Sequence, residues 1–178
     1  MTSIDTHSHS NAGDLVITLE GILVKEFRTC RTLQQLVRQE RQLLTTADVD
    51  ALAELVEDKE VLLDELNQIE EQRRLIVEQL AESYPDIEES SSVSDLLPYL
   101  DRAASRRVDR LYTGIGTVIE QIREYNHGNQ ALALNGLKRV DAVQAYLLDI
   151  FQKPGMYQPP GSTPQMAPAL VWDVDQRT

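Results

Sequence analysis

Apolar residues recur at alternating steps of three and four along the segment between Asp48 and Ser83. The positions of this pattern are Leu52, Leu55, Lys59, Leu62, Leu66, Ile69, Arg73, Ile76 and Leu80. Such a heptad spacing places the side chains on one side of a long α-helix and is typical of a seam between packed helices. Only Lys59 and Arg73 interrupt it. Long cationic stems can lie along a seam with their charged ends in water, so the pattern assigns these two residues no special role. The seam is widened by Val56, Leu63 and Val77, which predicts contact with more than one neighbouring helix.

A second helix is predicted before this one, from Asp14 as N-cap to Leu44. Its apolar positions also alternate by three and four: Leu15, Leu19, Ile22, Leu33, Leu36 and Leu43, with Glu26 and Glu40 at two further seam positions. Thr45 and Asp48 have the spacing of a capping box for the helix that follows. Because the intervening loop is very short, we expect the two helices to fold back as an antiparallel pair.

The rest of the chain divides into a linker, a third helix and two polar ends. Ser83–Asp95 contains a proline and a serine run, with Ser94 or Asp95 capping a short segment after it, and about Arg102–Phe151 is predicted to be helical. Local bends are expected at its glycines, Gly114, Gly116, Gly128 and Gly136. We therefore predict an all-α fold, an antiparallel bundle or coiled coil of three long helices in residues 14–153. A flexible segment, residues 1–13, precedes it, and an irregular tail rich in proline and glycine, residues 154–178, follows.

Composition argues against several classes of function. The formal net charge of −12 opposes nucleic-acid binding and attachment to anionic membranes. The longest apolar run, LVITLEGILV, is too short to span a bilayer, and the N-terminus does not resemble a signal peptide, so a cytoplasmic protein is expected. A single cysteine, Cys30, fits a reducing compartment. The pair His7 and His9 lacks a third metal ligand, and His127 lacks a catalytic partner. We predict no cofactor, no metal and no enzymatic activity.

The helix after Asn126 carries a broad apolar side. At 100° per residue, that side holds Leu132, Ala133, Leu137, Val140, Val143, Leu147, Leu148, Ile150 and Phe151, with Gln144 as the one polar residue among them. Ordinary core packing on the first two helices is one interpretation, and it is the one that the pattern alone favours. The other is an interaction helix whose apolar side binds a partner helix.

Three short motifs occur in order along the chain. In the first, a turn ending at Asp48 leads into Leu52, Leu55, Val56, Lys59, Leu62, Leu63 and a later Arg73. The second has two asparagines three residues apart followed by spaced aliphatics: Asn126, Asn129, Leu134, Leu137, Val140 and Leu147. The third is Tyr157 with Gly161. Together they resemble the FlgN family of flagellar type III export chaperones, over roughly residues 15 to 161.

The resemblance implies a chaperone that binds the C-terminal helical segment of hook–filament junction proteins, prevents their premature assembly and delivers them to the flagellar export apparatus. It shifts the interpretation of the third helix towards client binding. The implied client-binding residues are Asn126, Asn129, Leu132, Leu137, Val140, Val143, Leu147, Leu148 and Phe151. The alternative hypothesis is a homodimeric coiled-coil scaffold without an export client. Neither hypothesis involves a nucleic acid or insertion into a membrane.

Overall fold

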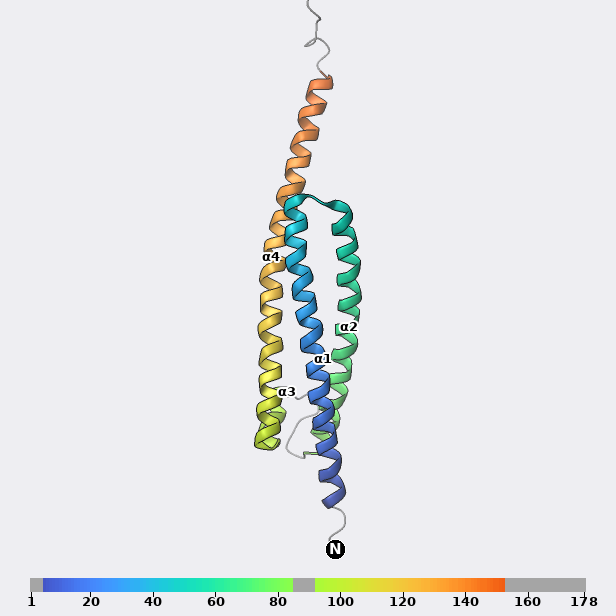
Figure 1. Cartoon of the computed structure of the whole chain (residues 1–178), viewed down its shortest axis with the longest axis vertical. Coiled ribbons are helices and arrows are strands. Elements are labelled where there is room, and N and C mark those ends of the chain that lie inside the picture. Colours follow the sequence, from blue (N-terminus) through green and yellow to red (C-terminus); the bar gives the residue numbers. More distant parts are fainter. Residues whose placement is uncertain (1–4, 85–91, 153–178) are drawn as a thin grey trace, which may run out of the picture. The chain divides into compact units, whose positions relative to one another are not determined.

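The computed structural model describes residues 5–84 and 92–152, with side chains from 12–84 and 92–151. The elements are α1 (Asp5–Thr46), α2 (Val49–Glu82), α3 (Val93–Leu96), the 3-10 helix η1 (Leu97–Tyr99) and α4 (Arg102–Gln152) (Figure 1). No strand occurs in these ranges, so the predicted all-α class is confirmed. The chain forms two compact units, residues 1–137 and 138–178. The tail, including Tyr157 and Gly161, lies outside the described residues.

Helices α1 and α2 form the predicted antiparallel hairpin, but its turn is capped differently from the prediction. Asp48 is the N-cap of α2, and its carboxylate accepts a hydrogen bond from the Ala51 N–H at 3.2 Å. Ala47 has a φ of 55°, and the Asp48 N–H donates to the Leu43 carbonyl at 3.2 Å, which closes the end of α1 as a Schellman motif. The predicted capping box is wrong because the Thr45 hydroxyl donates back to the Arg41 carbonyl of its own helix.

The start of α1 also differs from the prediction. The helix begins at Asp5 and not at Asp14, so residues 5–13 are helical. Once a helix has formed, each residue added to it gains one hydrogen bond without a new nucleation cost. Ala12 and Val16 are buried in the first unit, which gives this end of the helix tertiary support.

The seam of the hairpin contains two ion pairs between charged residues that face each other. Glu40 pairs with Lys59, with nitrogen–oxygen distances of 3.1 and 3.0 Å. Glu26 lies 3.2 Å from the Arg73 Nε. All four side chains are mostly buried, so the interpretation of Lys59 and Arg73 as cations with solvated ends is wrong. Burial raises the pKa of Glu26, although the nearby Arg73 opposes that rise.

Within the first unit, α4 packs on the hairpin in an apolar core. Its buried residues include Ala104, Val108, Ile115, Val118 and Ile122. The glycines do not interrupt the helix, and a Cβ at Gly114 would lie 3.3 Å from the Phe27 ring, so this glycine permits close packing on α1. Two fully buried residues of α3, Val93 and Leu96, belong to the same core.

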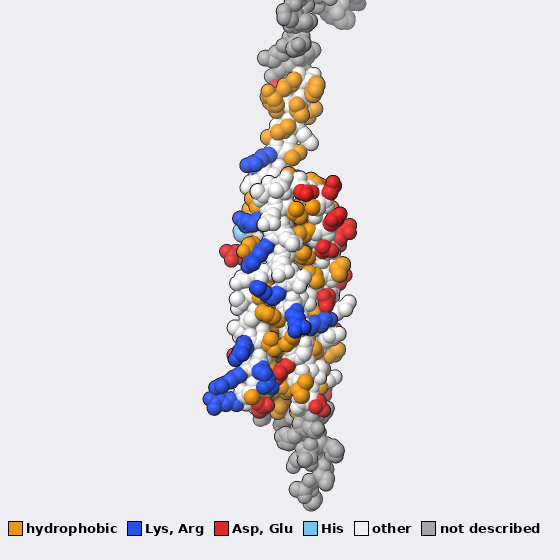
Figure 2. Space-filling model, viewed as in Figure 1, with side chains coloured by type: hydrophobic (Ala, Val, Ile, Leu, Met, Phe, Trp, Pro, Cys, Tyr) orange, Lys and Arg blue, Asp and Glu red, His pale blue; other side chains and the backbone are white. Residues whose placement is uncertain are grey.

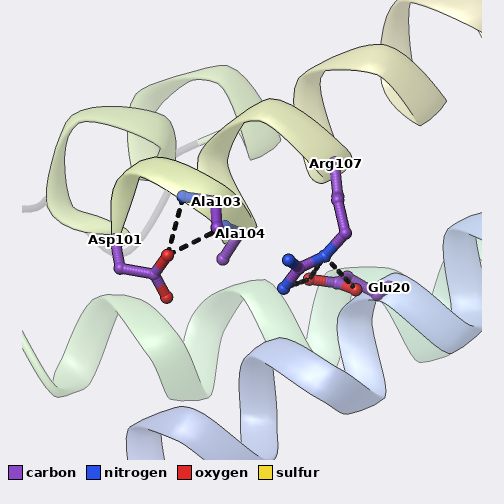
Figure 3. A network of polar contacts seen from close by, with 5 residues as sticks. All are labelled: Glu20, Asp101, Ala103, Ala104 and Arg107. Atoms are coloured by element: carbon purple, nitrogen blue, oxygen red, sulfur yellow. Dashed lines mark hydrogen bonds and ion pairs between the residues drawn. The ribbon is translucent and has the colours of Figure 1, made fainter.

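Short polar contacts fix the two helix starts that follow the linker. Ser92, and not Ser94 or Asp95, is the N-cap of α3, and the Asp95 carboxylate accepts bonds from its hydroxyl and N–H at 2.7 Å. The Asp101 carboxylate accepts bonds from the N–H groups of Ala103 and Ala104 at the start of α4 (Figure 3). These bonds hold the pKa of Asp101 below its ordinary value. One turn later, Arg107 binds Glu20 of α1 in a bidentate ion pair (Figure 3).

Candidate interaction surface on helix α4

Large apolar side chains of α4 are exposed from Leu134 onward. Nine of them are between 45% and 80% exposed. We call this set the exposed face: Leu134, Leu137, Val140, Val143, Tyr146, Leu147, Leu148, Ile150 and Phe151. Hydrophobic side chains dominate the C-terminal part of α4 in the space-filling view (Figure 2). Soluble proteins usually expose large apolar side chains singly and far apart. A continuous apolar surface of this extent is therefore typical of an interaction site.

The helix is amphipathic in this stretch. With 100° per residue, most of the exposed face lies on one side, while Lys138, Asp149 and Asn135 lie on the other. Seven members of the exposed face, Val140 to Phe151, lie in the second unit, where they span about 18 Å at 1.5 Å per residue. Such a helical stripe can bind an amphipathic helix that presents apolar residues every three or four positions.

The predicted site residues do not all belong to this surface. Leu137, Val140, Val143, Leu147, Leu148 and Phe151 are exposed members of it. Leu132 and Asn126 are half-buried. Asn129 is only 3% exposed and lies inside the first unit. Leu134, Tyr146 and Ile150 belong to the exposed face but are absent from the predicted client-binding set. The place of Tyr146 three residues after Val143 is a signal for it.

Asn129 is part of a hydrogen-bond network that joins three helices. Its Nδ2 donates to the Val37 carbonyl and to Glu40 Oε2, each at 2.8 Å. Glu40 in turn binds Lys59 of α2. A cleft of about 410 Å³ lies beside the network, and its apolar lining comes from Leu44, Leu52, Val56 and Ala133.

The described residues meet the requirements of neither a metal site, nor a membrane span, nor a reactive cysteine. No group of three or more metal-ligating side chains occurs within the ranges whose side chains are placed. No helix in the part of the chain that the structure describes is long and apolar enough to cross a membrane. Cys30 is buried, and burial together with Glu26 raises the pKa of its thiol to about 11. A thiol with that pKa stays protonated at neutral pH and is a poor nucleophile.

The fold and the surface together define an all-helical protein with an unusually apolar helix face. Comparison with protein families identifies its family: the model of the FlgN protein family matches residues 15–165, most of the chain. The chain therefore belongs to the FlgN family, which comprises chaperones of flagellar protein export. No curated protein and no solved structure matches the chain.

Proposed function

We propose that this protein is a cytoplasmic, non-enzymatic chaperone that binds the C-terminal helical segment of a hook–filament junction protein through the exposed face of α4. Binding prevents premature assembly of the junction protein, and the complex is delivered to the flagellar type III export apparatus. The observation that supports the proposal best is the run of exposed apolar side chains on Leu134–Phe151. Membership of the FlgN family, whose members are chaperones of flagellar protein export, supports the choice of a flagellar export substrate as the client.

The physical basis is the hydrophobic effect. Each Val or Leu side chain transferred from water into a helix–helix interface contributes about 1.5–3 kcal/mol if it becomes fully buried. Several such side chains along about 18 Å of helix in the second unit are enough for tight binding after the entropic cost of association. The net charge of −12 keeps a chain with this surface dispersed in water.

The test is a single charged substitution on the exposed face. Leu137→Asp and Val140→Asp are expected to abolish binding of a peptide corresponding to a junction-protein C-terminus, measured by calorimetry. Both residues are more than half exposed, so circular dichroism should show an intact fold. Ala142→Asp, on the opposite side of the same turn, is the matched control and should bind normally.

Three outcomes would contradict the proposal. Normal peptide binding by folded Leu137→Asp and Val140→Asp would place the client elsewhere. Unfolding of these variants would show that the face is core in solution. If the parent protein binds no peptide but is a dimer in ultracentrifugation, and Leu137→Asp and Val140→Asp are monomers, the homodimeric scaffold is favoured.

A further inference from the structure

The last buried residue of α4 is an asparagine in an otherwise apolar column. Val108, Ile115, Ile122 and Asn129 follow one another at steps of seven, and each is at most 7% exposed. After Asn129, no described side chain of α4 is buried. The last fully buried residue of the helix is therefore polar, and the exposed face begins five residues later.

The orientation of the Asn129 amide follows from its partners. The Val37 carbonyl and the Glu40 carboxylate both accept hydrogen bonds, so the nitrogen of the amide must face them. Asn129 Oδ1 is then left inside the protein without a hydrogen-bond partner among the described residues. An unpaired buried acceptor loses its hydration without compensation, which destabilises the fold.

The partners of Asn129 do not depend on it. Val37 lies inside α1, nine residues before its end, where its carbonyl accepts a helical hydrogen bond, and Glu40 retains Lys59. Replacement of Asn129 by leucine would therefore leave no new unpaired group and would remove one. On these grounds, asparagine is not the residue that maximises stability at this position. A buried asparagine in a heptad column is best known as a residue that fixes helix register at some cost in stability.

A competing position of α4 is available, because an apolar cleft lies beside the hydrogen-bond network of Asn129. The cleft lined by Leu44, Leu52 and Val56 can accept apolar side chains. Leu134 and Leu137 follow Ala133, which itself lines the cleft, on the same helix. A rotation of α4, or a slide by one turn of about 5.4 Å, would bury such residues in the cleft and would break both hydrogen bonds of Asn129.

We propose that Asn129 is a positioning residue, whose bonds to Val37 and Glu40 fix the register of α4 on the hairpin and keep the start of the exposed face out of the neighbouring cleft. The role in client binding rests on the function proposed above. The effect of Asn129 on the register of α4 does not rest on that function, so the register and client binding can be measured separately.

The experiment compares Asn129→Leu with His127→Leu in the full chain. His127 is an exposed residue on the opposite side of the same turn, so it controls for the added leucine. Asn129→Leu should melt at the parent's temperature or above it. Hydrogen exchange of backbone amides in residues 132–140 should slow at least tenfold, and binding of the junction-protein peptide should weaken at least tenfold. His127→Leu should match the parent in all three measurements.

Each outcome decides the proposal. Unchanged exchange in residues 132–140 of Asn129→Leu would overturn it, whatever the peptide does. A large fall in melting temperature would also overturn it, because Asn129 would then be a stabilising core residue. Slower exchange with parental peptide binding would support the register role and would instead contradict the client site on the exposed face.

Discussion

Glu26 and Arg73 form a buried ion pair in the hairpin, and loss of Arg73 should destabilise the protein more than loss of Glu26. The Glu26 side chain is 11% exposed and the Arg73 side chain 21%, and their closest atoms, Glu26 Oε2 and Arg73 Nε, lie 3.2 Å apart. Among the described residues, Arg73 is the one cation that acts on the Glu26 carboxylate, whereas Arg73 also lies 3.8 Å from Glu70. Loss of the arginine therefore leaves a buried carboxylate without compensation, while loss of the glutamate leaves a cation with a second partner.

The magnitude follows from this difference in burial. Breaking a buried pair costs about 3–5 kcal/mol, and we place Arg73→Met near 3 because the arginine is partly solvated. Glu26→Gln should cost about 1 kcal/mol, the value of an ordinary hydrogen bond. With a urea m-value of about 2 kcal/mol/M, Arg73→Met should lower the denaturation midpoint by roughly 1.5 M.

The pH dependence gives an independent check. The pKa of Glu26 is raised in the folded protein, so between its ordinary value and the raised value the folded state binds more protons than the unfolded state. The contribution of Glu26 to stability therefore falls as pH rises through that window. Removal of Arg73 raises this pKa further. The stability difference between Arg73→Met and the parent should be greatest above the raised pKa of Glu26 in the variant, and it should narrow as the pH falls through that pKa towards the ordinary value.

The neighbouring arginine supplies the control. Arg74 is mostly exposed and pairs with Glu71 and Glu78 on the surface. Arg74→Met should leave the urea midpoint nearly unchanged, because exposed ion pairs contribute little. Equal midpoints for Arg73→Met and Arg74→Met, or a deficit independent of pH, would refute the argument from burial.

Two further substitutions test the turn and the core. Ala47→Gly should stabilise the protein by about 0.5–1 kcal/mol in thermal unfolding, because Ala47 has a φ of 55° that glycine adopts without strain; a lower melting temperature would contradict this. Leu80→Ala should cost about 2–5 kcal/mol in urea unfolding because Leu80 is fully buried, whereas Leu75→Ala, at a position 45% exposed, should cost far less; equal costs would show that the described core is wrong.

Periodicity alone was sufficient to predict much of the hairpin. Every position of the α2 seam is buried or half-buried, because a heptad repeat must face a neighbour to leave water. The pairing of its charged residues was also present in the sequence. Glu26 and Glu40 are two heptads apart, and so are Arg73 and Lys59, so one antiparallel register brings both pairs together. The periodicity of each helix alone does not show this pairing, because it depends on the register between the two helices, and so the ends of Lys59 and Arg73 were predicted to be solvated.

The candidate site was harder to predict because an apolar helical pattern does not show whether its side chains are buried against another helix or exposed. The third helix has the same three-and-four spacing in its buried first part and its exposed last part, and only the structure separates them at Asn129 and Leu134. The burial of Asn129 could have been inferred from its seven-residue distance from Ile122. The resemblance to the FlgN family instead implies that the Asn129 amide contacts the client.

The division within α4 explains how one helix can contribute to the core and also, in the proposed function, provide a binding surface. Apolar side chains are available to a client only if they are not buried within their own chain. The cleft beside Ala133 on the hairpin is a place where they could be buried. Hydrophobic contacts are not directional and cannot by themselves set the residue at which packing stops. Hydrogen bonds are directional, so the two bonds of Asn129 can set that residue. The unpaired Oδ1 is then the energetic cost of a boundary that leaves the exposed face in water.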